Sequence, residues 1–143
     1  MPNAAAAFAQ YRKTETETLT QRDLLVRLYF GIERFINIAA QSMREKQWYE
    51  ANENCQKAKR IFIELLSTLN LEVGGQLAQQ LRDLYLFMIT EIVESNVHHD
   101  PERILKLLPV VATLRSAWEE IPAEEANVSS LNGDAQSNFS ART

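Results

Sequence analysis

Apolar residues recur at intervals of three and four along most of this chain, the spacing that places side chains on one face of an α-helix. Four segments carry such a stripe, at about residues 20–45, 48–69, 76–97 and 101–121. In the second segment the stripe consists of Ala51, Cys55, Ala58, Phe62, Leu65 and Leu69. The pattern therefore predicts four helices.

Polar, glycine and proline residues mark the ends of these segments. Thr20 can cap the first helix, because Asp23 follows it at the spacing of a capping box. Gly74 and Gly75 favour a connection between the second and third helices, since each glycine lowers helix stability by about 1 kcal/mol relative to alanine. Asp100 precedes a proline, a combination that is typical of a helix start.

The fourth predicted helix contains Pro109 and is followed by Pro122. Pro109 removes one backbone hydrogen bond, so we expect it to bend the helix. Four helices with short connections predict an all-α fold, an antiparallel up-down-up-down four-helix bundle over residues 20–121. We expect residues 1–19 to form a short segment that docks on the bundle. Residues 122–143, rich in Ala, Ser, Asn and Glu, are expected to form a disordered tail.

The first and third segments have more apolar residues than one core face requires. Besides the stripe through Leu81, the third segment carries a second one through Ala78, Tyr85, Ile89 and Val93. The first has apolar residues outside its core stripe at Val26, Tyr29, Phe30 and Ile36. Such surplus faces predict a groove that takes an amphipathic helix or an extended peptide. The two tyrosines suit a core margin and an interface equally well.

Composition narrows the class of function. The 143 residues, 45% of them hydrophobic, fit a single domain. A net charge of -4 argues against a nucleic-acid partner. No apolar run approaches the length of a membrane span, and residues 1–10 lack the basic start of a secretory signal. We therefore expect a cytoplasmic protein without membrane insertion.

The sequence contains no pattern that indicates catalysis or metal binding. His98 and His99 are consecutive, so their side chains diverge on a helix, and Glu94 with His98 has the spacing of an ordinary ion pair. A di-iron bundle needs two Glu-x-x-His pairs, which the chain lacks. Cys55 falls on an apolar stripe and is expected to be a small buried hydrophobe. We predict no catalytic residue, no metal site and no cofactor, and hence that the protein is not an enzyme.

One set of residues resembles a known family. The set comprises Ser67-Thr68-Leu69-Asn70, Glu72, Gly74-Gly75, Leu77-Ala78, Leu81, Leu84-Tyr85, Met88, Glu94-Ser95-Asn96 and Asp100, with Leu28-Tyr29-Phe30-Gly31, Arg34-Phe35 and Tyr11 upstream. It is similar to the motifs of the flagellar secretion chaperones, FliS, over about residues 11–121.

The resemblance implies a function. In that family the bundle binds the disordered carboxyl-terminal segment of flagellin, prevents premature polymerisation and delivers flagellin to the gate of the flagellar type III export apparatus. The amino-terminal segment lies over the empty groove, which would make Phe8 and Tyr11 the plug here. The residues predicted to line the groove are Val26, Tyr29, Phe30, Ala78, Tyr85, Ile89, Val93 and Asn96.

Three positions depart from the family pattern. The family usually has Ser-Pro at Thr20-Gln21, aspartate at Phe30 and alanine at Ser95. Phe30 exchanges a charge for a ring, which either reflects local packing or a relaxed surface position, or enlarges the partner-binding surface. A self-associating structural bundle is the alternative function, because wide apolar stripes also serve association between copies. We expect a monomer, and a weak homodimer stays open.

Overall fold

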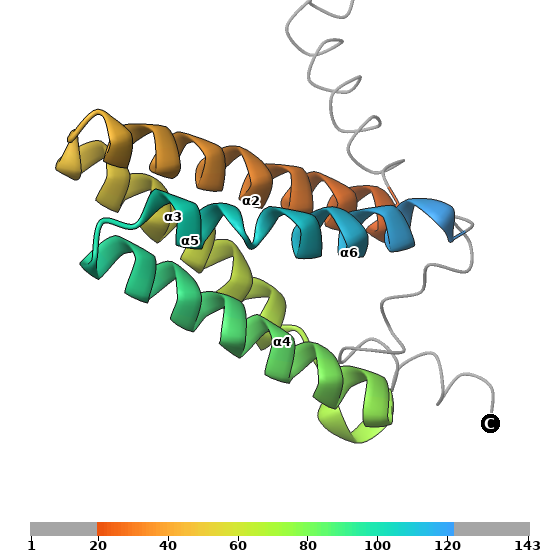
Figure 1. Ribbon diagram of the computed structural model, residues 1–143. Helices are drawn as coiled ribbons and strands as arrows, with labels where there is room; N and C mark the ends of the chain where they lie inside the picture. Colours follow the sequence, from red (N-terminus) through yellow and green to blue (C-terminus); the bar gives the residue numbers. More distant parts are fainter. Residues whose placement is uncertain (1–19, 122–143) are drawn as a thin grey trace, which may run out of the picture.

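The computed structural model describes residues 20–121, all of whose regular structure is helical (Figure 1). The helices are α2 (Gln21–Arg44), α3 (Trp48–Ser67), α4 (Leu71–Val97), α5 (Pro101–Leu105) and α6 (Leu108–Glu120). The docking segment predicted for residues 1–19, with Phe8 and Tyr11, and the tail predicted for residues 122–143 lie outside the described residues.

The helices pack in the order of the chain. The helix α2 packs on α3, α3 packs on α4, and α5 and α6 return along α2, with α5 also touching α4. The result is an up-down-up-down four-helix bundle whose fourth member is divided into α5 and α6 (Figure 1). The predicted all-α bundle is confirmed.

Short polar side chains begin three of these helices. The Thr20 hydroxyl accepts a hydrogen bond from the Asp23 N–H at 3.0 Å. The Asn70 carboxamide oxygen accepts two, from the second and third residues of α4, at 3.1 and 3.0 Å. The Asp100 carboxylate accepts one from the Arg103 N–H at 3.0 Å. Each cap satisfies amides that the first helical turn leaves unpaired.

The expected connection around the glycine pair is a kink inside α4. Gly75 has φ 58° and ψ -138°, so the chain leaves the helical conformation at this one residue. A Cβ atom there would meet nothing within 4 Å, and the left-handed φ alone favours glycine. The helix therefore begins at Leu71, before the predicted start at residue 76.

The predicted bend in the fourth helix is a break. The helix α5 ends at Leu105, and Pro109 occupies the first turn of α6. Pro109 has no N–H to donate to the Leu105 carbonyl, and its ring would clash with that carbonyl in a continuous helix. In a first turn the missing N–H costs nothing.

The two stripes predicted on α4 share a single buried face. Its buried residues Ala78, Leu81, Tyr85, Met88 and Ile92 come from both stripes. The wide face is buried because neighbours pack on α4 from two sides, α3 and α5.

The prediction that three residues line the groove must therefore be corrected. Tyr29, Ala78 and Tyr85 are buried in the core, so the folded bundle does not present them on its surface. The Tyr29 and Tyr85 hydroxyls are hydrogen-bonded to each other at 2.7 Å, which satisfies two polar groups inside the core.

Candidate functional site

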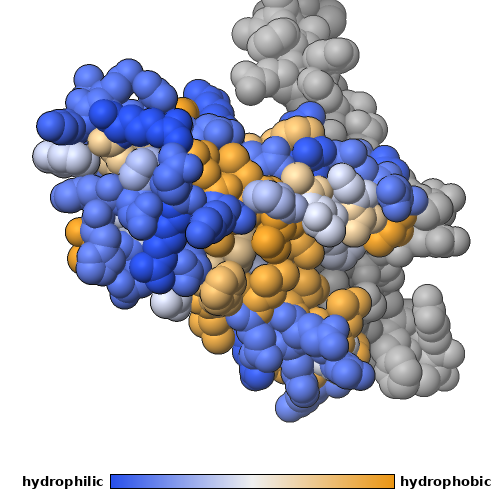
Figure 2. Space-filling view, viewed as in Figure 1, coloured by the Kyte–Doolittle hydropathy of each residue, from blue (hydrophilic) through white to orange (hydrophobic). Residues whose placement is uncertain are grey.

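The helices α4 and α6 diverge and leave an opening between them. At one end α4 is tied to α5, where the Arg103 guanidinium donates to both carboxylate oxygens of Glu91 at 2.6 and 3.2 Å. From this tie α4 runs away from α6 toward its own amino-terminal end (Figure 1). The divergence produces the largest exposed apolar surface that Figure 2 shows.

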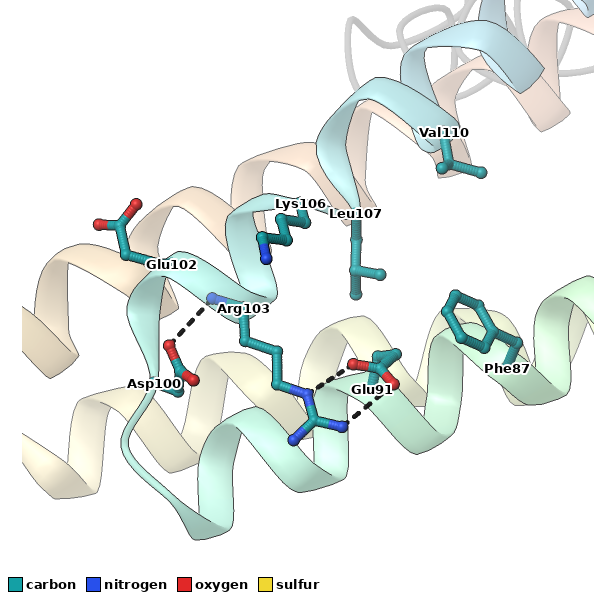
Figure 3. A pocket seen from close by; sticks show the side chains of 8 residues that line it. All are labelled: Phe87, Glu91, Asp100, Glu102, Arg103, Lys106, Leu107 and Val110. Atoms are coloured by element: carbon teal, nitrogen blue, oxygen red, sulfur yellow. Dashed lines mark hydrogen bonds and ion pairs between the residues drawn. The ribbon is translucent and has the colours of Figure 1, made fainter.

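A cleft of about 540 Å³ lies at the tied end of this opening (Figure 3). It is lined by Phe87, Glu91, Asp100, Glu102, Arg103, Lys106, Leu107 and Val110. Its charged residues gather at the α4–α5 junction, whereas the ring of Phe87 and the side chain of Val110 lie across the opening from each other (Figure 3). The cleft is polar at one end and apolar at the other.

The apolar lining extends along both helices. Leu77 and Leu84 share a side of α4 with Phe87 and Glu91, because these residues are separated by whole helical turns. Leu114 likewise shares a side of α6 with Val110, and Leu107 precedes Val110 by three residues at the start of that helix. We call this surface the α4–α6 groove: Leu77, Leu84, Phe87, Val110 and Leu114, with the buried Leu107 at the inner wall of the cleft. Figure 2 shows hydrophobic surface along the opening, bordered by hydrophilic residues.

Two groove side chains are far more exposed to solvent than the side chains of the core. Phe87 is 52% exposed and Leu77 is 55% exposed, while Leu84, Val110 and Leu114 are half-buried. Large apolar side chains left open to water along one side of a helix favour a binding surface over a chance distribution of exposed residues.

Three helices meet in a hydrogen-bonded aromatic cluster of Tyr29 from α2, Tyr85 from α4 and Trp118 from α6. Burial raises the pKa of the Tyr29 hydroxyl, an effect partly opposed by hydrogen bonds with Tyr85 and Trp118. Burial also raises the pKa of Tyr85, and the neighbouring Tyr29 raises it further. Both phenols therefore stay neutral at physiological pH, as buried hydrogen-bonding groups should.

The remaining predicted groove residues lie in separate places. Val26 is half-buried on α2, and Phe30 is exposed on the same helix. Ile89 is half-buried and Val93 is 38% exposed on a side of α4 turned away from Phe87. The Asn96 amide donates to the Asn52 side-chain oxygen at 2.8 Å and so joins α4 to α3. These residues do not form one continuous surface.

Phe30 lies at the seam between α2 and α6. Its ring faces the Arg115 guanidinium at 4.3 Å from the ring centroid. The same guanidinium donates to Glu33 and to Glu119, each at 2.8 Å. A cation over a ring is attracted to its negative face, so this contact supports the local-packing interpretation of Phe30.

Sequence analysis did not assign Phe87 to the groove. Leu77 and Leu84 have the helical spacing of the stripe through Leu81, which periodicity assigns to the core. One available signal was that Phe87 lies outside both stripes, so a bulky ring falls on a side of α4 that has no predicted partner.

The other polar candidates have local partners. The ring Nε2 of His98 lies 3.2 Å from the Glu94 carboxylate, and His99 stacks on Trp48 with 4.1 Å between ring centroids. Burial raises the pKa of the Cys55 thiol to about 11, so it stays protonated. Among residues 20–121, no cluster of three His, Cys, Asp or Glu side chains can hold a metal ion. None of the helices in this range is long and apolar enough to cross a bilayer.

Comparison with known proteins gives a consistent result. A family model described as Flagellar protein FliS matches residues 4–125. A protein of Vibrio cholerae named flagellar secretion chaperone FliS is 35% identical over 98 residues, 68% of this chain and 71% of the relative. Proteins of the same name from Bacillus subtilis and Campylobacter jejuni are each 29% identical, over 79% and 83% of this chain and 84% and 93% of their own lengths.

Proposed function

The chain belongs to the FliS family of flagellar proteins, and from this premise we propose that it is the export chaperone of flagellin. In this proposal it binds the disordered carboxyl-terminal segment of flagellin in the cytosol, prevents premature polymerisation and delivers flagellin to the flagellar type III export apparatus. The observation that carries the proposal is the α4–α6 groove, with large apolar side chains that the bundle leaves uncovered.

The groove suits an amphipathic helix. The two helices that border it present apolar residues at spacings of three, four and seven, which a third helix can match with anchors at the same spacing. A bound helix would cover Phe87 and Leu77 on one side and Val110 on the other. Its polar face would remain in water.

The client has a physical reason to need such cover. A filament subunit carries terminal segments whose apolar faces are buried only on assembly, and exposed faces of this kind associate prematurely. Binding that folds a disordered segment buries roughly 1,000 to 3,000 Å² and costs about 2 to 5 kcal/mol in ordering the peptide. The ordering cost keeps the complex reversible, as release at the export apparatus requires.

An empty groove also needs cover. By family resemblance we propose that Phe8 and Tyr11 of the amino-terminal segment lie over the groove before flagellin arrives, and that flagellin displaces them.

Calorimetry tests the proposal directly. We expect a peptide with the sequence of the cognate flagellin carboxyl terminus to bind the full chain, with a negative heat-capacity change from apolar burial. A scrambled peptide of the same composition serves as the control and should not bind. Equal binding of both peptides, or of neither, would contradict the proposed function.

Light scattering during gel filtration distinguishes the alternative of a self-associating bundle. A chaperone should elute at the same mass over a range of concentrations and shift when the flagellin peptide is added. For a self-associating protein the measured mass should increase with protein concentration and should not change when the peptide is added.

A further inference from the structure

Four basic side chains project from the outer faces of α2 and α3. Arg27 and Arg34 are exposed on α2, and Lys57 and Arg60 are exposed on α3. None of the four forms an ion pair with another residue of the described range 20–121. Other arginines of the bundle do have carboxylate partners, namely Arg22, Arg44, Arg82, Arg103 and Arg115.

The helices α2 and α3, which carry these four charges, pack directly on each other. The Lys57 ammonium of α3 lies over the Phe35 ring of α2, 5.6 Å from its centroid. Arg27 and Arg34 are two helical turns apart on one side of α2. Lys57 and Arg60 are one turn apart on one side of α3.

Exposed apolar side chains flank the charges on α2. On α2, Leu24 precedes Arg27 by one turn and is 47% exposed, and Ile38 follows Arg34 by one turn and is 37% exposed. Glu64 is an acidic neighbour at the Leu24 end, where both line a small notch. We call this surface the α2–α3 basic face: Leu24, Arg27, Arg34, Ile38, Lys57 and Arg60.

The face lies on the side of the bundle opposite the α4–α6 groove. In the ring of helices α2 and α3 are adjacent, and α4 and α6 border the other side. A ligand in the groove therefore leaves the basic face accessible.

We propose that the α2–α3 basic face docks an acidic amphipathic segment of a partner protein, whose carboxylates pair with Arg27 and Arg34 on α2 and whose apolar residues cover Leu24 and Ile38. The four cations have no carboxylate partner within residues 20–121, so they favour negative charge at this face although the net charge of the chain is -4. The flanking apolar residues favour a protein segment over a polyphosphate, which offers such residues nothing to pack on. The proposal does not depend on what occupies the groove.

Fluorescence anisotropy with a labelled probe tests the docking. The probe is a short helix-forming peptide with glutamates on both sides of a leucine stripe, titrated with the full chain at physiological ionic strength. The variant Arg27→Glu/Arg34→Glu should weaken binding about tenfold, the size expected when several exposed ion pairs become repulsive. The matched control Lys46→Glu/Lys59→Glu changes the net charge equally outside the face and should bind as the wild type does.

A second variant keeps the test decisive if the first fails to fold, as judged by circular dichroism. Lys57→Glu/Arg60→Glu alters the α3 side of the face and should also weaken binding about tenfold. Equal weakening by the control variant would mean that only total charge matters and would overturn the proposal. So would the absence of binding to the wild-type chain.

Three further titrations exclude other partners. Polyglutamate without apolar residues, a DNA duplex and vesicles containing anionic lipid should each bind more weakly than the probe, and tighter binding of any of them overturns the proposal. The flagellin peptide at saturation should leave the affinity for the probe unchanged. Displacement of the probe would show that it had entered the groove, whereas failure of the flagellin peptide to bind would affect only the proposed function.

Discussion

Replacing Phe87 with aspartate tests the groove at its most exposed ring. Phe87 is 52% exposed, and a phenylalanine offers roughly 200 Å² for burial, so about 100 Å² is available to a bound peptide. At about 25 cal/mol per Å² this area contributes roughly 2.5 kcal/mol to binding. Loss of that contribution weakens the affinity about 60-fold. The buried carboxylate adds a further penalty, so we expect a loss at least this large.

The assay is calorimetry with the flagellin carboxyl-terminal peptide. The matched control is Tyr49→Asp, which makes the same kind of change at an aromatic residue of α3 that is 72% exposed and does not line the cleft. Both variants should keep the wild-type helicity, because neither ring is buried. Only Phe87→Asp should lose binding.

A third variant makes the result decisive. Val93→Asp alters the side of α4 that sequence analysis predicted for the client, away from Phe87. If Phe87→Asp binds as the wild type does and Val93→Asp does not, the client lies on the other flank of α4. The assignment of the groove to α4 and α6 would then be wrong.

Four further predictions follow from single features of the structure. The buried Ser95 hydroxyl has no hydrogen-bond partner among residues 20–121, so Ser95→Ala should raise the free energy of unfolding by about 1 kcal/mol in urea denaturation. Tyr85→Phe should lower that free energy by about 1 kcal/mol, and adding Tyr29→Phe should cost less than the sum of both single changes, because the two hydroxyls bond each other. Deleting residues 1–13 should leave the bundle folded and should tighten binding of the flagellin peptide, as calorimetry would show. The hydrogen bond from Arg103 lowers the pKa of Glu91 below its ordinary value of 4.5. The ion pair therefore stabilises the folded protein above that pH, and this stabilisation is lost as the pH falls through the folded-state pKa of Glu91. Urea denaturation between neutral and acidic pH measures the loss.

Each of these predictions has a contrary outcome. Destabilisation by Ser95→Ala would show that its hydroxyl has a partner in solution. Additive losses at the two tyrosines would mean that the hydroxyl pair does not form. Complete loss of peptide binding on deletion of residues 1–13 would refute the plug. In the last experiment Glu91→Gln is the control, and an identical decline of its stability with pH would assign the decline to other carboxylates.

Local chemistry made the helix ends predictable from the sequence. The Thr20 and Asp100 caps act through amides within three residues, so their effect does not depend on the rest of the fold. The Gly74-Gly75 break was predicted for the same reason. Its position within α4 was not, because Leu71 can begin a helical turn once Asn70 caps it.

The binding surface was less predictable, because it depends on which helices are neighbours. The sequence alone allows Tyr85 to face either the core or the client. The fold decides this, because the Tyr29 hydroxyl of α2 lies 2.7 Å from the Tyr85 hydroxyl. The partner of Phe30 is Arg115, which is distant in sequence and reaches Phe30 only through the packing of α6 on α2. The periodicity of the sequence indicates that there are more apolar residues than the core needs. It does not show that these residues lie in the groove between α4 and α6.

The groove itself results from where α4 is fastened. Within residues 20–121, no hydrogen bond or ion pair joins α4 directly to α6, whereas Arg103 of α5 binds Glu91 of α4 through two contacts. Because Pro109 forces a break after α5, the segment fastened to α4 and the segment that follows it are separate helices, both packed along α2. The bundle can therefore close at the α5 end and stay open along α6. This asymmetry gathers the uncovered apolar residues, Phe87 among them, into one groove.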